Sequence, residues 1–192
     1  MYLKIRPLIC PFPLIEEHVP QKCTVVDIGC GFGSFSHYLS IKSNERNVIG
    51  IDLSEERILQ AQSLYEKSSN LNFVCSNITN TKIPKANAVT AIDVLHHIAS
   101  KEQQKKLLAS CFSILTDNGV IIIKDLDTKP TWKYYWNYIH DFIMTKGEPV
   151  LYRSSNEMKN MLTEIGFKLE YFKSLKGYPY AHVLYVARKI AK

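Results

Sequence analysis

The sequence predicts an α/β fold, a three-layer α/β/α sandwich built on a mostly parallel sheet. Short apolar runs rich in Val and Ile alternate along the chain with amphipathic segments, which is typical of parallel strands covered by helices on both faces. The chain also closes with two β-rich runs joined by a turn, which indicates a terminal hairpin. With 192 residues, 46% hydrophobic and 22% charged, residues 1–192 suit one globular domain.

The first half contains five expected strands, each separated from the next by a helix or a connecting loop. The strands are expected over 24–28, 47–52, 71–75, 88–93 and 120–124, and the helices over 34–41, 55–67 and 101–115. The last of these helices should stop at Asp117-Asn118-Gly119, because Asn and Gly are common helix C-terminal signals.

The second half departs from simple alternation. An aromatic helix is expected over 132–144, inside an insert that covers 129–153, and a further helix over 154–165. The terminal hairpin pairs 167–173 with 182–188 across a turn that contains Gly177 and Pro179. This makes seven strands in total.

The glycine-rich turn after the first strand is the most informative stretch of the chain. The strand leads into Gly29, Gly31 and Gly33, and a helical pattern follows. Glycine has no Cβ and tolerates positive φ, so a ligand can lie against bare backbone beside the N–H groups that begin the helix. The dinucleotide fingerprint G-x-G-x-x-G would need its third glycine at Ser34, so the spacing disfavours a nicotinamide enzyme.

This turn resembles motif I of the class I S-adenosylmethionine-dependent methyltransferases, particularly their small-molecule type. The resemblance rests on Asp27-x-Gly29-x-Gly31-x-Gly33 and on Asp52 at the end of the second strand, and it extends over 25–188. It implies S-adenosylmethionine as cofactor and S-adenosylhomocysteine as product. It also implies a sheet whose last strand is antiparallel and inserted between its neighbours.

The resemblance assigns roles to individual residues. Asp27 would support the turn or meet the cofactor's amino group, the glycines would admit the methionine part, and Asp93 would border it after the fourth strand. A carboxylate at the end of a second strand can accept both ribose hydroxyls, which is the role of Asp52. The adenine would lie against Leu53, Asn77 and Ile78. Many family members carry an acid where this chain has Asn77, and capping of a turn is the alternative role for that side chain.

Two histidines are candidate general bases. His97, in the pair His96-His97 after the fourth strand, and His140 in the insert titrate near neutral pH, and a base is needed only when the acceptor must lose a proton. The other polar groups available to an acceptor are Tyr134, Tyr138, Asp141, Asp125 and Asp127. Positioning and desolvation can supply much of the catalysis, because a sulfonium methyl donor is already activated.

The specificity-determining segments should be residues 1–20 and the aromatic insert. In a helix, Trp132 and Trp136 share one face, and Tyr135, Tyr138 and Phe142 form an adjoining face. The insert is therefore predicted to be a lid over an apolar pocket or an interfacial helix, with simple packing on the sheet as the alternative. We expect a small, apolar or lipid-like acceptor, and leave O-, N- and C-methylation open.

Composition and charge bear on the alternative functional classes. The net charge of +6 and the pI near 9.0 admit an RNA methyltransferase as an alternative, but nucleic acid is the less favoured partner because the basic residues are scattered. A catalytically inactive, cofactor-binding partner subunit is a second alternative. The cysteines lack C-x-x-C spacing, so we expect reduced thiols, no metal, and a cytoplasmic protein with optional peripheral membrane contact.

Overall fold

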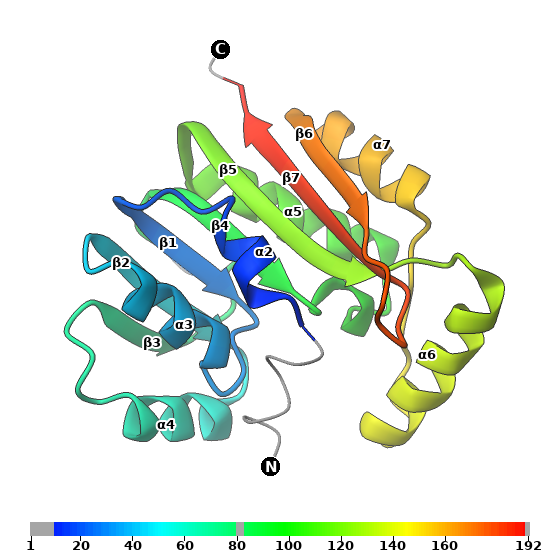
Figure 1. The fold of residues 1–192 in the computed structure, drawn as a ribbon, viewed down its shortest axis with the longest axis horizontal. Helices are drawn as coiled ribbons and strands as arrows, with labels where there is room; N and C mark the ends of the chain where they lie inside the picture. The colour runs from blue at the N-terminus through cyan, green and yellow to red at the C-terminus, as the bar shows by residue number, and fades with distance from the viewer. Residues whose placement is uncertain (1–9, 80–82, 191–192) are drawn as a thin grey trace.

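A seven-stranded sheet forms the centre of the computed structural model, which describes residues 10–79 and 83–190 (Figure 1). The strand order is β3-β2-β1-β4-β5-β7-β6, and β7 alone runs antiparallel, inserted between β5 and β6. The predicted mostly parallel sheet with an antiparallel last strand is thus confirmed. The strands are β1 (Cys23–Ile28), β2 (Arg46–Asp52), β3 (Leu71–Cys75), β4 (Ala86–Ile92), β5 (Leu115–Leu126), β6 (Phe167–Ser174) and β7 (His182–Lys189).

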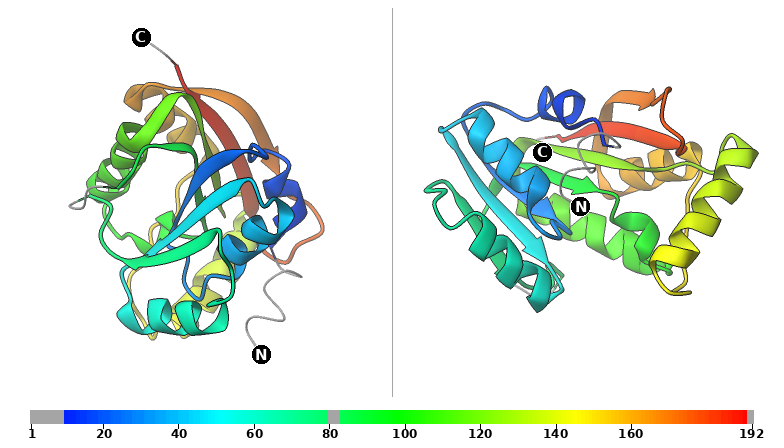
Figure 2. Two further views of the ribbon diagram at one scale, coloured as in Figure 1. Left: turned by 90° about the vertical axis from the view of Figure 1, so that its left-hand side faces the viewer. Right: turned by 60° about the horizontal axis from the view of Figure 1, so that its bottom comes forward.

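Helices cover both faces of this sheet, as the alternating pattern predicted (Figure 2). One face carries α2 (Phe12–Glu16), α3 (Ser34–Lys42) and α4 (Glu55–Leu64), and the other carries α5 (Lys101–Ile114) and α7 (Ser155–Ile165). A 3₁₀ turn, η1 (Leu95–His97), follows β4. The aromatic helix α6 (Thr131–Met144) lies beyond the end of β5, beside the sheet rather than on either face (Figure 1).

The core consists of apolar side chains that alternate between the two faces of each strand. Val25 packs with Phe35 and Leu39 of α3, whereas its neighbour Val26 packs in the cluster that contains Leu108 of α5. This alternation follows from the two-residue period of a strand. Both faces of the central strands are therefore buried, which explains why they read as continuous Val and Ile runs.

The largest difference from the predicted elements lies at the start of β5. Asp117-Asn118-Gly119 was expected to end a helix, but the helix stops at Ile114 and this segment belongs to β5. Pairing with β4 shifts between Ala86 opposite Leu115 and Ala88 opposite Val120, and Asn118 takes φ 60°. The turn residues therefore form an irregular bulge in a strand. A bulge and a helix C-terminus both require a residue with left-handed backbone, so the sequence signal is the same for the two.

Smaller differences occur elsewhere. Helix α4 ends at Leu64 instead of residue 67, β4 spans Ala86–Ile92 instead of 88–93, and α2 was not predicted at all. The segment around α2 is held by Arg46, whose side chain is buried and donates to Glu16 Oε1 at 2.6 Å and to the Val19 carbonyl at 2.8 Å.

The remainder of the predicted N-terminal specificity segment, residues 1–9, lies outside the described residues. Within the described ranges, no helix combines the length and apolar character that crossing a membrane requires.

The topology creates a crevice between β1 and β4. The chain winds outward from β1 through β2 to β3, and then returns to the other side of β1 to form β4 and β5. Loops that follow two neighbouring parallel strands diverge at such a switch point, and ligands bind outside the carboxyl ends of the strands there. The glycine turn after β1 and the Asp93-Val94 segment after β4 border this crevice.

Candidate active site

The glycine turn has the geometry of a ligand-contacting loop, and its glycines serve different purposes. All three have positive φ, at 65° for Gly29, 54° for Gly31 and 77° for Gly33. A Cβ at Gly29 would lie 2.5 Å from Val94 Cγ2, and one at Gly33 would overlap the Phe73 ring. A Cβ at Gly31 would meet no described atom within 4 Å. Gly29 and Gly33 are thus needed for packing, whereas Gly31 presents bare backbone to open space.

Asp27 lies beneath this turn instead of facing the crevice. Its side chain is 2% exposed, and its carboxylate accepts hydrogen bonds from Ser36 Oγ at 2.6 Å and Thr90 Oγ1 at 2.7 Å. These hydroxyls come from α3 and β4, so one carboxylate connects the strand before the turn, the helix after it and the neighbouring strand. Of its two predicted roles, support of the turn is the one that this geometry favours.

Asp52 is placed at the open side of the turn. Its Oδ2 accepts from the Gly31 amide at 2.8 Å and its Oδ1 from the Ser54 amide at 2.9 Å. Each carboxylate oxygen has a second lone pair, so Asp52 can still accept from the two hydroxyls of a ribose. The adjoining Leu53 is 72% exposed, which leaves an apolar surface for a flat ring.

The other two adenine candidates are less suitably placed. Asn77 Oδ1 accepts from the Thr79 amide at 3.0 Å and from Thr79 Oγ1 at 2.8 Å, the local turn that was its alternative role. Ile78 is 6% exposed and belongs to the main core cluster. Their contact with an adenine stays a prediction, and Leu53 offers far more accessible apolar surface than Ile78.

A second group of polar residues lies across the crevice, after β4 and at the end of β5. Asp93 takes φ 57° and pairs with Lys124 Nζ at 2.5 Å, and the Lys124 side chain is fully buried. The ligand atoms of Asp93, His96 and Asp125 lie within 4.8 Å of one another, close enough to suggest a metal site. The Lys124 ammonium already neutralises Asp93 and would repel a divalent cation, so the group is arranged as paired charges.

His96 is the centre of this group. Its Nδ1 bonds Asp125, its Nε2 lies 3.7 Å from Asp141 Oδ2, and its side chain is 4% exposed. Burial alone lowers the pKa of His96, but the carboxylates of Asp125, Asp93 and Asp141 outweigh burial and raise that pKa above its usual value. The imidazolium form is therefore favoured inside the protein.

His97 has the opposite character. Its side chain is exposed, and its ring lies 4.1 Å from the His96 ring, centroid to centroid. One side of the ring still rests on the protein, and this partial loss of solvent lowers the pKa of His97. The charge on His96 lowers that pKa further. The neighbouring histidines thus differ: one is buried and favours its cation, and the other reaches the surface and favours its neutral form.

His140 lies on α6, and that helix is oriented differently from our expectation. The buried residues of α6 are Asn137 and Asp141, whereas Trp132 and Trp136 are 64% and 53% exposed. A lid with its aromatic face over an apolar pocket is therefore wrong for this arrangement. The physical reason is Asp141, which accepts from Tyr152 Oη at 2.5 Å and lies near His96, so the polar face of the helix is the one directed inward.

His140 is consequently at the margin of the polar group. Its Nδ1 lies 3.4 Å from Asp141 Oδ1, its ring packs edge-on against Tyr180 at 5.2 Å, and its side chain is 42% exposed. Lys133, further back along α6, donates to the carbonyls of Tyr178 and Tyr180 at 2.6 and 3.3 Å. Polar contacts therefore attach α6 to the loop before β7.

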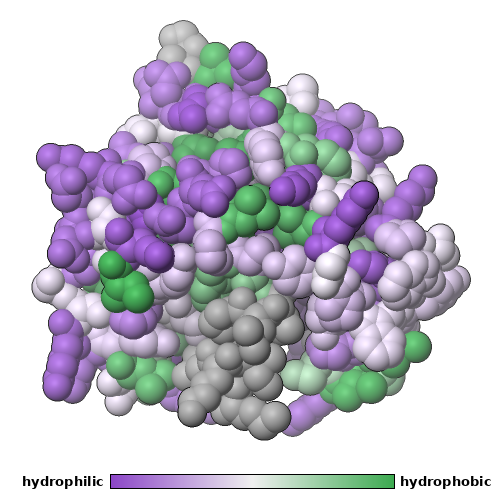
Figure 3. Space-filling view, in the orientation of Figure 1, coloured by the Kyte–Doolittle hydropathy of each residue, from purple (hydrophilic) through white to green (hydrophobic). Residues whose placement is uncertain are grey.

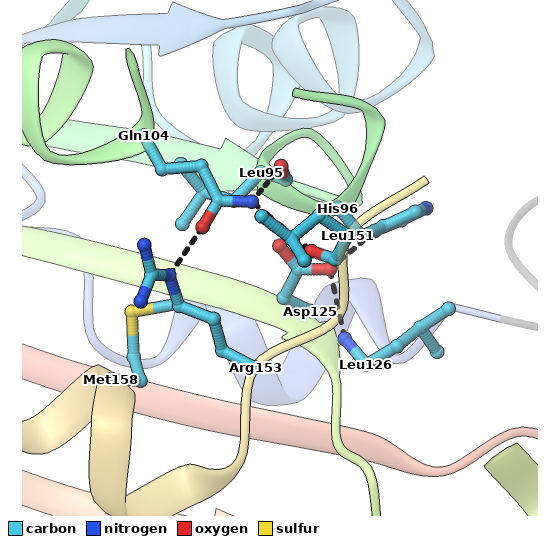
Figure 4. A pocket seen from close by; sticks show the side chains of 8 residues that line it. All are labelled: Leu95, His96, Gln104, Asp125, Leu126, Leu151, Arg153 and Met158. Carbon is cyan, nitrogen blue, oxygen red and sulfur yellow. Dashed lines mark hydrogen bonds and ion pairs between the residues drawn. The ribbon is translucent and has the colours of Figure 1, made fainter. Parts of the chain in front are cut away.

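A buried amide bonds the backbone of η1 (Figure 4). Gln104 is fully buried, and its Nε2 donates to the carbonyls of Leu95 at 2.9 Å and Leu151 at 3.0 Å. Its Oε1 accepts from the buried Arg153. A cavity of about 10 Å³ beside His96 and Asp125 completes this region, which is room for about one water molecule.

The crevice as a whole combines a bare glycine turn, a carboxylate placed for a ribose, and polar side chains on the opposite wall. This arrangement defines a class of protein, the α/β proteins that bind a nucleoside cofactor at a switch point. Comparison with known proteins then specifies which family of that class this chain represents.

Residues 25–119 match the family model described as "Methyltransferase domain". A protein of Invertebrate iridescent virus 6, named as a methyltransferase, is 31% identical over 141 residues, which cover 67% of this chain and 52% of the viral protein. The carboxy-S-adenosyl-L-methionine synthase of Helicobacter pylori strain HPAG1 is 26% identical over 172 residues, which cover 80% of this chain and 72% of the synthase. The chain thus spans about half the length of the viral relative.

Solved structures agree with the fold. A methyltransferase dependent on S-adenosylmethionine from Methanosarcina mazei has a TM-score of 0.77 at 20% identity, and the match covers 94% of this chain and 98% of that one. The 1,6-didemethyltoxoflavin-N1-methyltransferase of Burkholderia thailandensis, solved with S-adenosylhomocysteine, has a TM-score of 0.76 at 15% identity, with 95% and 78% covered. The chain belongs to the class I S-adenosylmethionine-dependent methyltransferases, whose cofactor is S-adenosylmethionine.

The structure places five of the eleven predicted site residues along one crevice. Gly31, Asp52 and Leu53 lie at the glycine turn and the end of β2, and Asp93 and His97 follow β4. From the sequence, His96 was ranked below His97, and Lys124, Gln104 and Asn137 had no predicted role. The pair His96-His97 was a usable signal for the first, whereas Lys124 is hidden in an apolar strand and its partner Asp93 becomes apparent only from strand pairing.

Replacement of Gly31 by Val should abolish binding of S-adenosylhomocysteine, because the new side chain would enter the space where bare backbone is presented. The matched control is Gly177→Val: Gly177 also has positive φ, at 88°, and open space around it, but lies in the terminal hairpin. Both variants should lose about 1–3 kcal/mol of stability through backbone strain. Calorimetric titration that finds equal affinities in the two variants would contradict the placement of the cofactor.

The stability of the protein should fall as pH rises above about 6.5, since the pKa of His96 is higher in the folded than in the unfolded chain. The stabilisation by His96 is fully present below the pKa that His96 has in the unfolded chain. It is lost as pH rises through the higher pKa that His96 has in the folded protein. His18, His37 and His97 have lowered pKa values, so their contributions change only below that range. Urea unfolding between pH 6.5 and 9 should give a slope of at most about 1.4 kcal/mol per pH unit. If His96→Gln showed the same slope, the pH dependence of the unfolding free energy would come from another group.

Proposed function

We propose that this chain transfers the methyl group of S-adenosylmethionine to a small-molecule acceptor in the crevice between the glycine turn and α6. The observation that carries the proposal is the open space at Gly31 beside Asp52, because it provides an uncovered backbone and a ribose-binding carboxylate at the switch point. The family supports the reaction class. When bound, the cofactor supplies a methyl group on a positively charged sulfur, which requires little activation by the protein.

The residues of this chain would position the reactants and control one proton. Asp52 would fix the ribose, and the Asp93–Lys124 pair would border the methionine part. His97 would take the proton that a hydroxyl, phenol or ring-nitrogen acceptor loses, because its lowered pKa keeps the imidazole neutral at physiological pH. His140, at the margin, is the second candidate for the same step.

The acceptor side of the crevice favours a polar acceptor over the apolar or lipid-like one expected from the sequence. The inward face of α6 carries Asn137 and Asp141, and all its aromatic residues except Tyr134 are exposed on the other side. Tyr152 and His96 add further polar atoms on the same wall. An apolar ring can still enter such a site, but the groups available to orient it are hydrogen-bonding ones.

Turnover with labelled cofactor tests the proposal. The protein would be incubated with methyl-labelled S-adenosylmethionine and separate pools of phenols, ring amides, amines and carboxylates, and S-adenosylhomocysteine would be quantified by mass spectrometry. Formation of S-adenosylhomocysteine with labelled product in one pool supports methyl transfer. Tight binding of S-adenosylhomocysteine without turnover in any pool would overturn methyl transfer and favour the cofactor-binding partner subunit.

The same experiment addresses a second reaction. The Helicobacter pylori relative is a carboxy-S-adenosyl-L-methionine synthase, and the match covers 80% of this chain. If this chain performs that reaction, a carboxylate of the pools should lose its carboxyl group and take up the proton that leaves the cofactor's methyl carbon. Carboxylated S-adenosylmethionine, heavier by CO₂, should then accumulate without labelled acceptor. Product mass thus separates the two reactions in one measurement.

Replacement of His97 should identify the base. In the wild-type enzyme, kcat/KM should increase with pH up to a pKa below 6.5 and stay level above it, since the neutral imidazole is the active form. His97→Gln should remove this dependence and reduce kcat by about 10²–10⁴-fold. His37→Gln is the control, because burial also lowers the pKa of His37, whose ring lies on α3 and stacks on Tyr65 instead of on His96. A wild-type profile in His97→Gln would refute the role.

The outward face of α6 supports one further proposal, contact with an anionic lipid surface by a cytoplasmic protein. Figure 3 shows pale and green surface gathered over α6. Large exposed side chains cluster there, namely Trp132, Tyr135, Trp136, Tyr138, Ile139, Phe142, Ile143 and Met144. Trp and Tyr suit the headgroup region of a bilayer, and the net charge of +6 adds attraction.

Vesicle sedimentation tests this contact. Trp136→Ser should weaken binding to vesicles of phosphatidylcholine and phosphatidylserine by about tenfold or more, since burial of a large side chain contributes about 1.5–3 kcal/mol. Leu59→Ser is the matched control, because Leu59 is similarly exposed, at 58%, but lies on α4. Equal binding of the two variants, or none by the wild type, would exclude the contact.

A further inference from the structure

Asn137 is the one buried side-chain amide on the inward face of α6, and its hydrogen bonds are missing. The residue is 0% exposed, and neither its amide nitrogen nor its amide oxygen has a partner among the described residues. Buried polar groups are almost always hydrogen-bonded, and an unsatisfied one costs about 1–3 kcal/mol. A side chain that destabilises the free protein in this way is expected to have a partner in another state of the protein.

Gln104 is a buried amide with a structural role, and it differs from Asn137 in its hydrogen bonds. Gln104 is equally buried, but its Nε2 donates to the carbonyls of Leu95, Ile98 and Leu151 and its Oε1 accepts from Arg153. Every polar atom of that amide is used. Asn137 therefore differs from a structural amide within the same fold.

The position of Asn137 connects it with the acceptor side of the crevice. Residues four apart in a helix share a face, so Asn137 is directed to the same side as Asp141, which contacts Tyr152 and His96. One turn earlier, Lys133 bonds the loop before β7, and the Tyr134 ring packs against Tyr152 at 5.5 Å. The amide is thus placed on the wall that faces the ends of β4 and β5.

Each charged group on this wall already has a hydrogen-bonding or ion-pair partner. Asp93 pairs with Lys124, His96 with Asp125, and Asp141 accepts from Tyr152. The group without a partner is neutral, and it presents an N–H donor beside a carbonyl acceptor. An acceptor molecule that satisfies both atoms must carry the complementary pair, as a carboxamide, lactam or similar ring amide does.

We propose that Asn137 is a specificity-determining residue that binds the methyl acceptor through this amide edge, and that the acceptor is an uncharged molecule with a carboxamide or lactam group. The inference rests on the proposed function. Since Asn137 is fully buried, α6 must move outward to admit the acceptor. This movement would exchange polar contacts rather than open an apolar core, because the helix buries only Asn137 and Asp141 and is attached largely by hydrogen bonds of Lys133 and Asp141.

A stability measurement separates this role from a structural one. Asn137→Leu should raise the melting temperature by about 2–4 °C, because it removes an unsatisfied buried amide of similar size. Gln104→Leu should lower it, because four hydrogen bonds lose their partner. Destabilisation of Asn137→Leu as large as that of Gln104→Leu would overturn the proposal, since Asn137 would then be bonded in the free protein.

Binding of matched probes tests recognition itself. Benzamide and acetophenone share a ring and a carbonyl and differ in the N–H donor, and both would be titrated calorimetrically into protein saturated with S-adenosylhomocysteine. Wild type should bind benzamide about tenfold more tightly than acetophenone, and Asn137→Leu should remove that preference. Equal binding of the two probes by wild type, or an unchanged preference in Asn137→Leu, would overturn the proposal. Absence of S-adenosylhomocysteine binding by wild type would instead refute the proposed function.

Discussion

The buried carboxylate of Asp27 is the constraint on which the site depends. It lies at the switch point of the sheet, where it accepts hydrogen bonds from Ser36 on α3 and from Thr90, its register partner on β4. A carboxyl group that is only 2% exposed is stabilised there because both hydroxyls are directed at it. The turn between β1 and α3 is thereby fixed relative to β4, and the two walls of the crevice keep their separation.

The remaining features of the cofactor side follow from that fixed turn. Gly29 packs against Val94 after β4, and Gly33 packs against Phe73 of β3, so a side chain at either position would displace the turn. Gly31, between them, is left with its N–H bonded to Asp52 and its Cα uncovered. Gly29 and Gly33 are packed against neighbouring side chains, and Gly31 between them is open. This explains why glycines spaced by two, rather than any glycine-rich sequence, produce this crevice.

The sequence allowed the fold and the cofactor side to be predicted because their signals are local. Short apolar runs rich in Val and Ile locate the strands, and the glycine spacing with Asp27 and Asp52 locates the turn. The acceptor side could not be predicted in the same way, since its contacts join residues distant in sequence. Lys124 meets Asp93 only after β4 and β5 pair in register, and Asp141 meets Tyr152 and His96 only after α6 is positioned.

Helix α6 illustrates why a periodic pattern can determine an element without determining its orientation. The pattern correctly predicted the helix and its aromatic face, and the usual rule directs such a face to the core. In this protein the sheet end is already occupied by paired charges, so an aromatic face would leave Asp125 and His96 next to apolar rings and without their third partner, Asp141. The polar face satisfies those groups, and the aromatic face is left outward. The polarity of the sheet end thus decides which face of the helix is buried, and it leaves the helix with one face for the crevice and another for the surroundings of the protein.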